Sequence, residues 1–183
     1  DEFDRSFLQL TPYISIVTSI DADHLDIYGD EHQLVDAFSQ FANKTMNDGV
    51  VIHSEYVALE TERRKLTYGF DSADVMAKNV RIEDGKTKFS VVTKEGLCFG
   101  DYEMQLFGRH NVMNALAAIM ACLQLHLDLS VIKEGLATFQ GVLRRFDIRY
   151  KDEKVCYIDD YAHHPEEIAA TLKAVRNVFP DKE

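Results

Sequence analysis

Hydrophobic residues in the first fifty positions follow the pattern of a strand, a helix and a second strand. Residues 13–20 form a mostly apolar run, which predicts a buried strand. Residues 31–44 repeat apolar side chains at helical spacing, and Asp30 and Gln33 have the spacing of an N-terminal capping pair. Residues 50–53 are short and apolar, as in a second strand. This order favours a parallel sheet.

The pattern changes between residues 65 and 107, where apolar and polar residues alternate. After a strand-like segment at 66–70, three alternating runs are separated by glycine-containing turns. These runs cover residues 75–82, 86–93 and 97–107. The spacing predicts an antiparallel meander that extends the edge of the main sheet.

Helical spacing returns in the last third of the chain. Apolar residues predict one helix over 112–127 and another over 131–139, with Ser130 as its N-cap. Strands are expected near 147–151 and 154–159, followed by a helix that begins at Pro165.

The predicted fold class is therefore α/β, in two units. Residues 1–148 are expected to form a parallel sheet with helices and an antiparallel meander. Residues 149–183 are expected to form the start of a second domain.

Composition narrows the class of protein. An apolar content of 46% and a charged content of 28% are ordinary for a soluble globular chain of 183 residues. A net charge of -11 argues against nucleic acid or an anionic membrane as partner, and no apolar run reaches the ~18 residues of a membrane span. Three widely spaced cysteines fit a reducing, cytoplasmic setting. The first residues are expected to be a cut within a folded domain, and the oligomeric state stays open.

The acidic stretch from Asp21 to Asp26 is a candidate metal site. It follows a predicted buried strand and places His24 among three carboxylates, at the strand end where open α/β sheets bind ligands. A solvated acidic loop explains the carboxylates equally well, because aspartate is common in turns.

Three further stretches carry candidate chemistry. Asn111 and Asn114 share one face at a helix start and offer both donors and acceptors, although simple capping would explain Asn111. Arg144 and Arg145 can hold phosphate, or serve as ordinary surface charge. Residues 159–165 run from a strand end into a helix N-terminus, a common position for ligands or for a metal-free cap.

Taken in order, five motifs resemble the Mur ligase family. They read D-E-F-D-R-S-F-L at 1–8, T-S-I-D-A-D-H-L-D at 18–26, G-R-H-N-V-M-N-A at 108–115, R-R-F at 144–146 and D-D-Y-A-H-H-P at 159–165. The resemblance implies that residues 1–148 belong to a central ATP-binding domain without its phosphate loop. Residues 149–183 then open a Rossmann-like C-terminal domain that binds the amino acid.

The resemblance also assigns roles in nucleotide and metal binding. His24 matches a catalytic histidine that contacts Mg²⁺. Asn111 and Asn114 match the pair that binds adenine, with His110 beside them. No lysine is assigned to the carbamylated position found in several members, and Lys44 is the nearest candidate.

Four residues near the end of the chain match positions around the reaction centre. Arg145 matches a catalytic arginine that reaches the ATP phosphates from the domain hinge, and Asp160 matches the acid that binds ribose. Tyr161 and His163 match positions near the UDP-N-acetylmuramate substrate.

The implied activity of the parent protein is ATP-dependent joining of L-alanine to UDP-N-acetylmuramate through an acyl phosphate, in peptidoglycan synthesis. The 183-residue chain alone is expected to be inactive. Ser19 and Ala162 depart from the common pattern, and Ala162 also occurs in the relative that recycles murein tripeptide. The alternatives are that relative, a non-catalytic nucleotide- or metal-binding module, and a small metallohydrolase centred on the acidic stretch.

Overall fold

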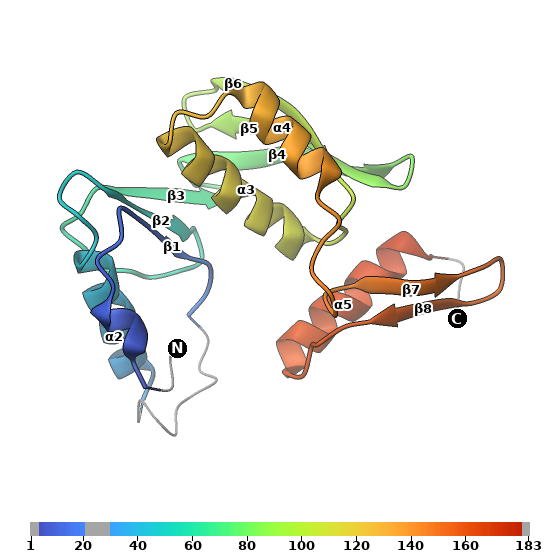
Figure 1. The fold of residues 1–183 in the computed structure, drawn as a ribbon, viewed down its shortest axis with the longest axis horizontal. Coiled ribbons are helices and arrows are strands. Elements are labelled where there is room, and N and C mark those ends of the chain that lie inside the picture. The colour runs from blue at the N-terminus through green and yellow to red at the C-terminus, as the bar shows by residue number, and fades with distance from the viewer. Residues whose placement is uncertain (1–3, 21–29, 181–183) are drawn as a thin grey trace.

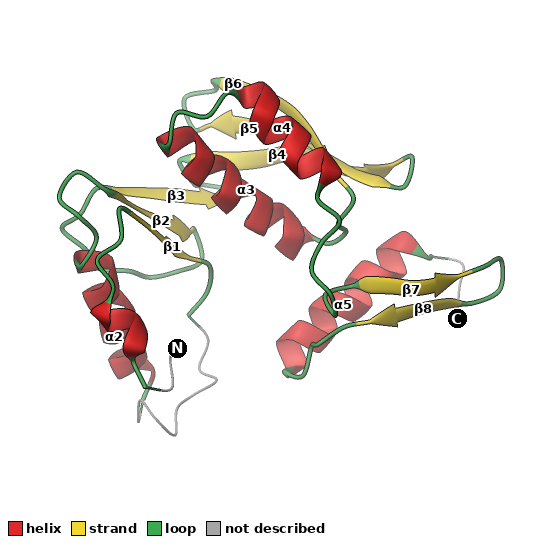
Figure 2. Ribbon diagram, in the orientation of Figure 1, coloured by secondary structure: helices red, strands yellow, loops and turns green. Residues whose placement is uncertain are grey.

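A computed structural model describes residues 4–20 and 30–180. Figures 1 and 2 show a larger unit built on a mixed sheet and a smaller unit of one hairpin and one helix. Residues 21–29, which contain His24 and the rest of the acidic stretch, lie outside the described residues.

The larger unit is organised around one six-stranded sheet in the order β1-β2-β3-β4-β5-β6. Its strands are β1 (Ile14–Val17), β2 (Val50–Ser54), β3 (Lys65–Gly69), β4 (Val75–Glu83), β5 (Lys86–Thr93) and β6 (Cys98–Met104). The first four strands pair in parallel, and β4, β5 and β6 pair antiparallel. The predicted parallel unit and meander are therefore confirmed, as parts of one continuous sheet.

Helices α2 (Glu31–Asn43) and α3 (Arg109–Gln124) pack on opposite faces of this sheet. Because neighbouring strand residues point to opposite faces, Val51 packs on the α2 side and Ile52 on the α3 side. Asp30 accepts a hydrogen bond from the Gln33 backbone at 2.9 Å, which confirms the predicted cap. The short 3-10 helix η1 (Ser6–Gln9) places Phe7 against Phe38 and Phe41 of α2.

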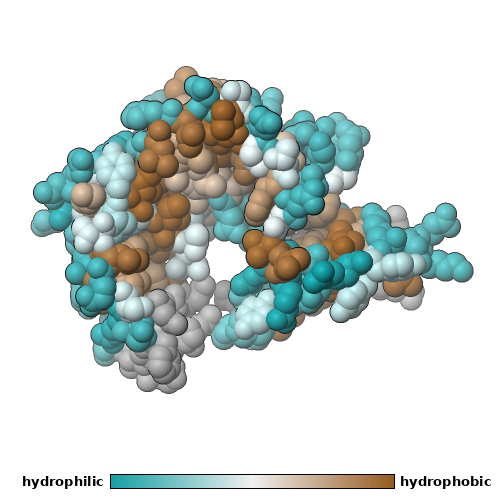
Figure 3. All heavy atoms as spheres, viewed as in Figure 1, coloured by the Kyte–Doolittle hydropathy of each residue, from teal (hydrophilic) through white to brown (hydrophobic). Residues whose placement is uncertain are grey.

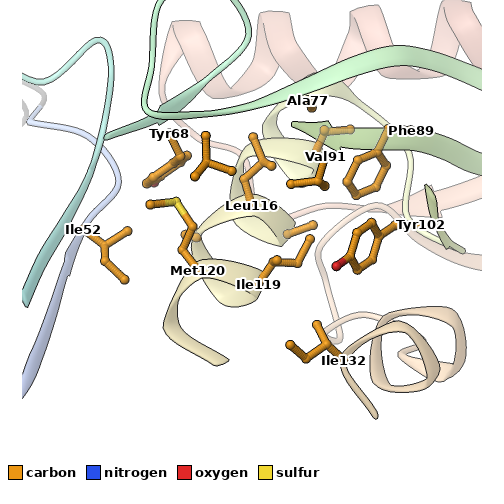
Figure 4. Close-up of a cluster of buried hydrophobic side chains, with 14 of the residues drawn as sticks. Ile52, Tyr68, Ala77, Phe89, Val91, Tyr102, Leu116, Ile119, Met120 and Ile132 are labelled. Carbon is orange, nitrogen blue, oxygen red and sulfur yellow. The ribbon is translucent and has the colours of Figure 1, made fainter. Parts of the chain in front are cut away.

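The main core lies between the sheet and α3, as Figure 4 shows. Leu116, Ile119 and Met120 of α3 are almost fully buried, and Phe89 stacks on Tyr102 with ring centroids 5.9 Å apart. Burial of each such side chain contributes about 1.5–3 kcal/mol. Ile132 of α4 (Leu129–Thr138) closes the end of this core beside β6. The core therefore fixes α3 rigidly on the sheet.

Two predicted helix starts were wrong. The N-cap of α4 is Asp128 and not Ser130, and the Asp128 side chain makes no capping hydrogen bond, so side-chain capping does not decide this helix start. Helix α3 begins at Arg109, three residues before the predicted start, with Gly108 as its N-cap. Asn111 is thus inside the helix and is not its cap.

The smaller unit consists of β7 (Asp147–Lys151), β8 (Cys156–Asp159) and α5 (Pro165–Val178). The two strands form an antiparallel hairpin, and α5 begins at Pro165 as predicted. Strand β7 runs across the predicted division between residues 148 and 149. Figure 3 shows apolar side chains gathered along α3 and α4 and again on part of the smaller unit.

Candidate functional site

The N-terminus of α3 depends on a glycine. Gly108 has a φ of +96°, and a Cβ at this position would lie 2.7 Å from Cε1 of His110 and 3.4 Å from Cβ of Ala174 in α5. Only glycine suits both the backbone angle and the close approach. The start of α3 therefore lies close to α5 of the smaller unit.

Asn111 and Asn114 lie one turn apart at this helix start. The Nδ2 of Asn111 donates a hydrogen bond to the Phe107 carbonyl at 2.8 Å, and this leaves its Oδ1 for another partner. Asn114 is exposed. The predicted amide pair is therefore available on one side of the helix, next to backbone N–H groups that favour anions.

His110 connects this helix to the smaller unit electrostatically. Partial loss of contact with water lowers the pKa of His110; the nearby Asp160 carboxylate opposes this shift and Arg145 adds to it. The histidine nevertheless remains exposed at the surface. Its neutral form is favoured, so the ring offers one donor and one acceptor.

The loop after β3 is braced by a residue that sequence reasoning missed. The Glu55 carboxylate accepts backbone hydrogen bonds from Phe70, Asp71 and Ser72 at 2.5, 3.2 and 2.8 Å. Burial raises the pKa of Glu55, but these hydrogen bonds outweigh it and the net pKa is lowered. The Arg109 guanidinium lies 3.8 Å from the centre of the Phe70 ring and so connects this loop to α3. A lone Glu after a strand carries no sequence signal for such a role.

The R-R-F and D-D-Y motifs form one connected unit. The two carboxylate oxygens of Asp160 accept backbone hydrogen bonds from Phe146 at 2.7 Å and from Ala162 at 2.8 Å. The Tyr161 backbone N–H donates to the Arg144 carbonyl at 2.8 Å. Arg144 and Phe146 adopt left-handed φ angles of +61° and +51°. Asp160 thus stabilises a backbone conformation that is costly for residues other than glycine.

Arg145 projects from this unit with more than half of its side chain exposed. Its Nη1 lies 3.7 Å from Oε1 of Glu167 in α5, and its Cζ lies 5.7 Å from the centre of the Tyr161 ring. Arg144 lies over the same ring at 4.9 Å and forms a long ion pair with Asp159 at 3.9 Å. The predicted arginine and tyrosine are therefore in contact.

His163 lies beside Tyr161 and, like Arg145, close to Glu167. Its ring centroid is 5.1 Å from that of Tyr161, and its Nδ1 is 3.0 Å from the Tyr161 carbonyl oxygen and 3.5 Å from Oε2 of Glu167. Tyr161 and His163 are both exposed. They form one accessible surface next to Arg145.

The two groups of predicted residues meet where the units join. The Phe107 and Phe146 rings contact each other edge to face at 6.0 Å, between the helix start and the R-R-F motif. His110 therefore lies close enough to Asp160 and Arg145 to interact with their charges, although they are thirty or more residues apart in sequence. Asn111 and Asn114 follow it on the same helix. His24 lies outside the described residues, so its placement relative to this group stays a prediction.

Within residues 4–20 and 30–180, no cluster of three or more His, Cys, Asp or Glu side chains could hold a metal ion.

A separate cavity of about 460 Å³ lies at the far end of α3, beside Leu66, Met120 and Leu123. It contains none of the predicted site residues. None of the helices in the described ranges combines the length and apolar character that a membrane span requires.

The fold and these motifs define a class of ligase. The family model of the Mur ligase middle domain matches residues 3–122, and that of the Mur ligase glutamate ligase domain matches residues 144–183. The chain therefore belongs to the Mur ligase family, as the motifs predicted.

Its relatives include UDP-N-acetylmuramate–L-alanine ligases. The enzyme of Cytophaga hutchinsonii is 42% identical over 186 residues, and that of Salinibacter ruber is 41% identical over 189 residues. Each match covers all of this chain and 40% of the relative. The chain thus spans about 40% of the length of these relatives.

Solved structures agree with this relationship. The UDP-N-acetylmuramate–alanine ligase MurC of Thermotoga maritima has a TM-score of 0.86 and 30% identity, over 99% of this chain and 42% of that one. A MurF ligase of the same organism, in complex with ADP, has a TM-score of 0.75 and 16% identity, over 94% of this chain and 41% of that one. At that identity the second match shows the fold alone.

Proposed function

We propose that this chain is part of an ATP-dependent ligase that joins L-alanine to UDP-N-acetylmuramate in peptidoglycan synthesis. The observation that carries the proposal is the meeting of the α3 start with the R-R-F and D-D-Y-A-H-H-P motifs. The names and whole-chain similarity of the relatives support this choice of substrates.

In this proposal the start of α3 binds the nucleotide base. The Asn111 Oδ1 and the exposed Asn114 amide offer acceptors and donors for the edge of a purine. His110, favoured as the neutral ring, adjoins them. The rigid packing of α3 on the sheet keeps these groups in place without reorganisation at binding.

Arg145 is proposed to reach the phosphates of ATP. Its guanidinium is exposed and carries five donors, of which the ion pair with Glu167 engages only part. A positioned cation neutralises the charge that develops as the phosphoryl group moves to the substrate carboxylate. The L-alanine amine then attacks the acyl phosphate and releases phosphate. Tyr161 and His163 offer the neighbouring surface for UDP-N-acetylmuramate.

Asp160 is proposed to bind the ribose of ATP, but its existing hydrogen bonds limit how it can do so. Both of its oxygens already accept from backbone N–H groups, so a ribose hydroxyl must use a remaining lone pair. When bound, Mg²⁺ would neutralise negative charge on the ATP phosphates. The proposed protein contact is His24, and the described residues supply no further ligand cluster.

The test is substrate choice in a full-length ligase that contains this chain. ADP release should depend on both UDP-N-acetylmuramate and L-alanine. Release with murein tripeptide, and none with L-alanine, would assign the chain to the recycling relative. Release with neither would contradict the proposal.

Cys98, Cys122 and Cys156 are unpaired, which supports the proposed cytoplasmic location.

A further inference from the structure

Glu167 occupies a central position at the junction of the motifs. Its Oε2 accepts backbone hydrogen bonds from His163 at 3.1 Å and from His164 at 3.4 Å, and its Oε1 lies 3.7 Å from Nη1 of Arg145. It is the third residue of α5, where a carboxylate caps the helix and favours its dipole. One carboxylate thus contacts the helix start, the hinge arginine and His163.

The charge of Glu167 is maintained by this environment. The backbone N–H of His163 lowers the pKa of Glu167 most, and burial opposes the shift only partly. The nearby Arg145 guanidinium lowers the pKa further. Glu167 therefore remains ionised at neutral pH, and its negative charge attracts the Arg145 guanidinium.

Arg145 has few other restraints. Among the described residues its side chain contacts Glu167 and the face of Tyr161, and its backbone belongs to a loop with left-handed residues on both sides. An unrestrained arginine loses about 2 kcal/mol of rotamer entropy when it is fixed. A carboxylate that already limits its rotamers reduces the loss that remains at phosphate binding.

We propose that Glu167 is a positioning residue, which orients Arg145 for the reaction while it caps α5. This inference rests on the proposed function through the role of Arg145. Glu167 acts through Arg145 and does not touch substrate. Its contribution should appear in turnover and disappear when Arg145 is removed.

Glu167→Gln separates the two roles of the carboxylate. The amide oxygen of glutamine still accepts from the His163 and His164 backbone, but the charge facing Arg145 is lost. Glu167→Ala removes both roles. Glu134→Gln, on the exposed surface of α4, is the matched control for a neutralised helical glutamate.

In a full-length ligase that contains this chain, Glu167→Gln should lower kcat about ten-fold and change the KM for ATP less than about three-fold. In an Arg145→Ala background the same substitution should change kcat less than about two-fold, because contacting residues that act together are not additive. Wild-type kcat in Glu167→Gln, or an equal loss in both backgrounds, would refute the positioning role. Absence of ligation by the wild type would instead refute the proposed function.

A second measurement is independent of ligase activity. In the 183-residue chain, the ¹⁵N relaxation of the Arg145 side-chain Nε should show that its motion is restricted. In Glu167→Gln the mobility of this side chain should increase. The Arg63 side chain, which donates to Asn43 and Asn47, is the internal reference and should not change. Equal mobility of Arg145 in the two proteins would overturn the inference.

Discussion

At the residue scale, His53 shows how burial fixes a charge state. Its side chain is 5% exposed within β2, and its Nδ1 lies 3.0 Å from the Ser54 carbonyl, so Nδ1 must carry the hydrogen. Nε2 is buried without a partner among the described residues. Loss of hydration lowers the pKa of His53, so folding selects the neutral ring.

The stability of the chain should therefore fall as the pH drops below the ordinary histidine pKa of about 6.5. The unfolded chain then binds a proton at His53 that the folded chain does not, and this costs at most about 1.4 kcal/mol per pH unit. His53→Asn should flatten the decline in unfolding free energy measured between pH 7.5 and 5.5.

His32→Asn, at an exposed position of α2, is the control and should keep the wild-type slope. His110 also has a lowered pKa, so part of the decline should persist in His53→Asn. An unchanged slope in His53→Asn would contradict the assignment.

Individual residues of the candidate site also show what could not be predicted from the sequence. The motif residues could be singled out by type and spacing, and their roles remain proposals. The two hydrogen bonds of Asp160 could not be predicted, because residue identity does not reveal whether backbone groups already occupy a carboxylate. Glu55 was not predicted to be important, because its backbone N–H partners are brought close only by folding. The N–H partners of Glu167 are local and fit the predicted helix start, but its approach to Arg145 depends on the fold and could not be predicted.

At the scale of elements, the hydrophobic pattern predicted α2, the meander and α5 closely, because each has a one-sided apolar face or clear alternation. The start of α3 was placed three residues late. Its N-cap, Gly108, has no side chain to signal it, and the angle it adopts depends on contacts with His110 and Ala174. Tertiary packing therefore decided this boundary.

Gly108→Ala should destabilise the chain by about 1–3 kcal/mol, because the new Cβ meets His110 and the φ of +96° is strained for alanine. Gly135→Ala is the matched control, since nothing lies within 4 Å of its Cβ position and it is helical. That control should stabilise by about 0.4–1 kcal/mol. Equal unfolding free energies of the two variants in denaturant titrations would contradict the account of the α3 start.

At the scale of the whole molecule, the two units join where the α3 start meets the hinge motifs. The Phe107–Phe146 contact and the approach of Ala174 to Gly108 bring the helix that carries the proposed base-binding groups against the unit that carries Arg145. Relative motion of such units is a common way to assemble a catalytic site after nucleotide binding. The cation at the hinge should then matter more for turnover than for the affinity of the resting protein.

The most direct test of this account compares Arg145→Ala with wild type in a full-length ligase that contains this chain. We predict that kcat for L-alanine-dependent ADP release falls about 100-fold or more, while the Kd for ATP rises less than about five-fold. Arg81→Ala, on an exposed strand end of the meander, should leave both values unchanged. Unchanged turnover in Arg145→Ala would contradict the central claim that the hinge arginine acts on the phosphates.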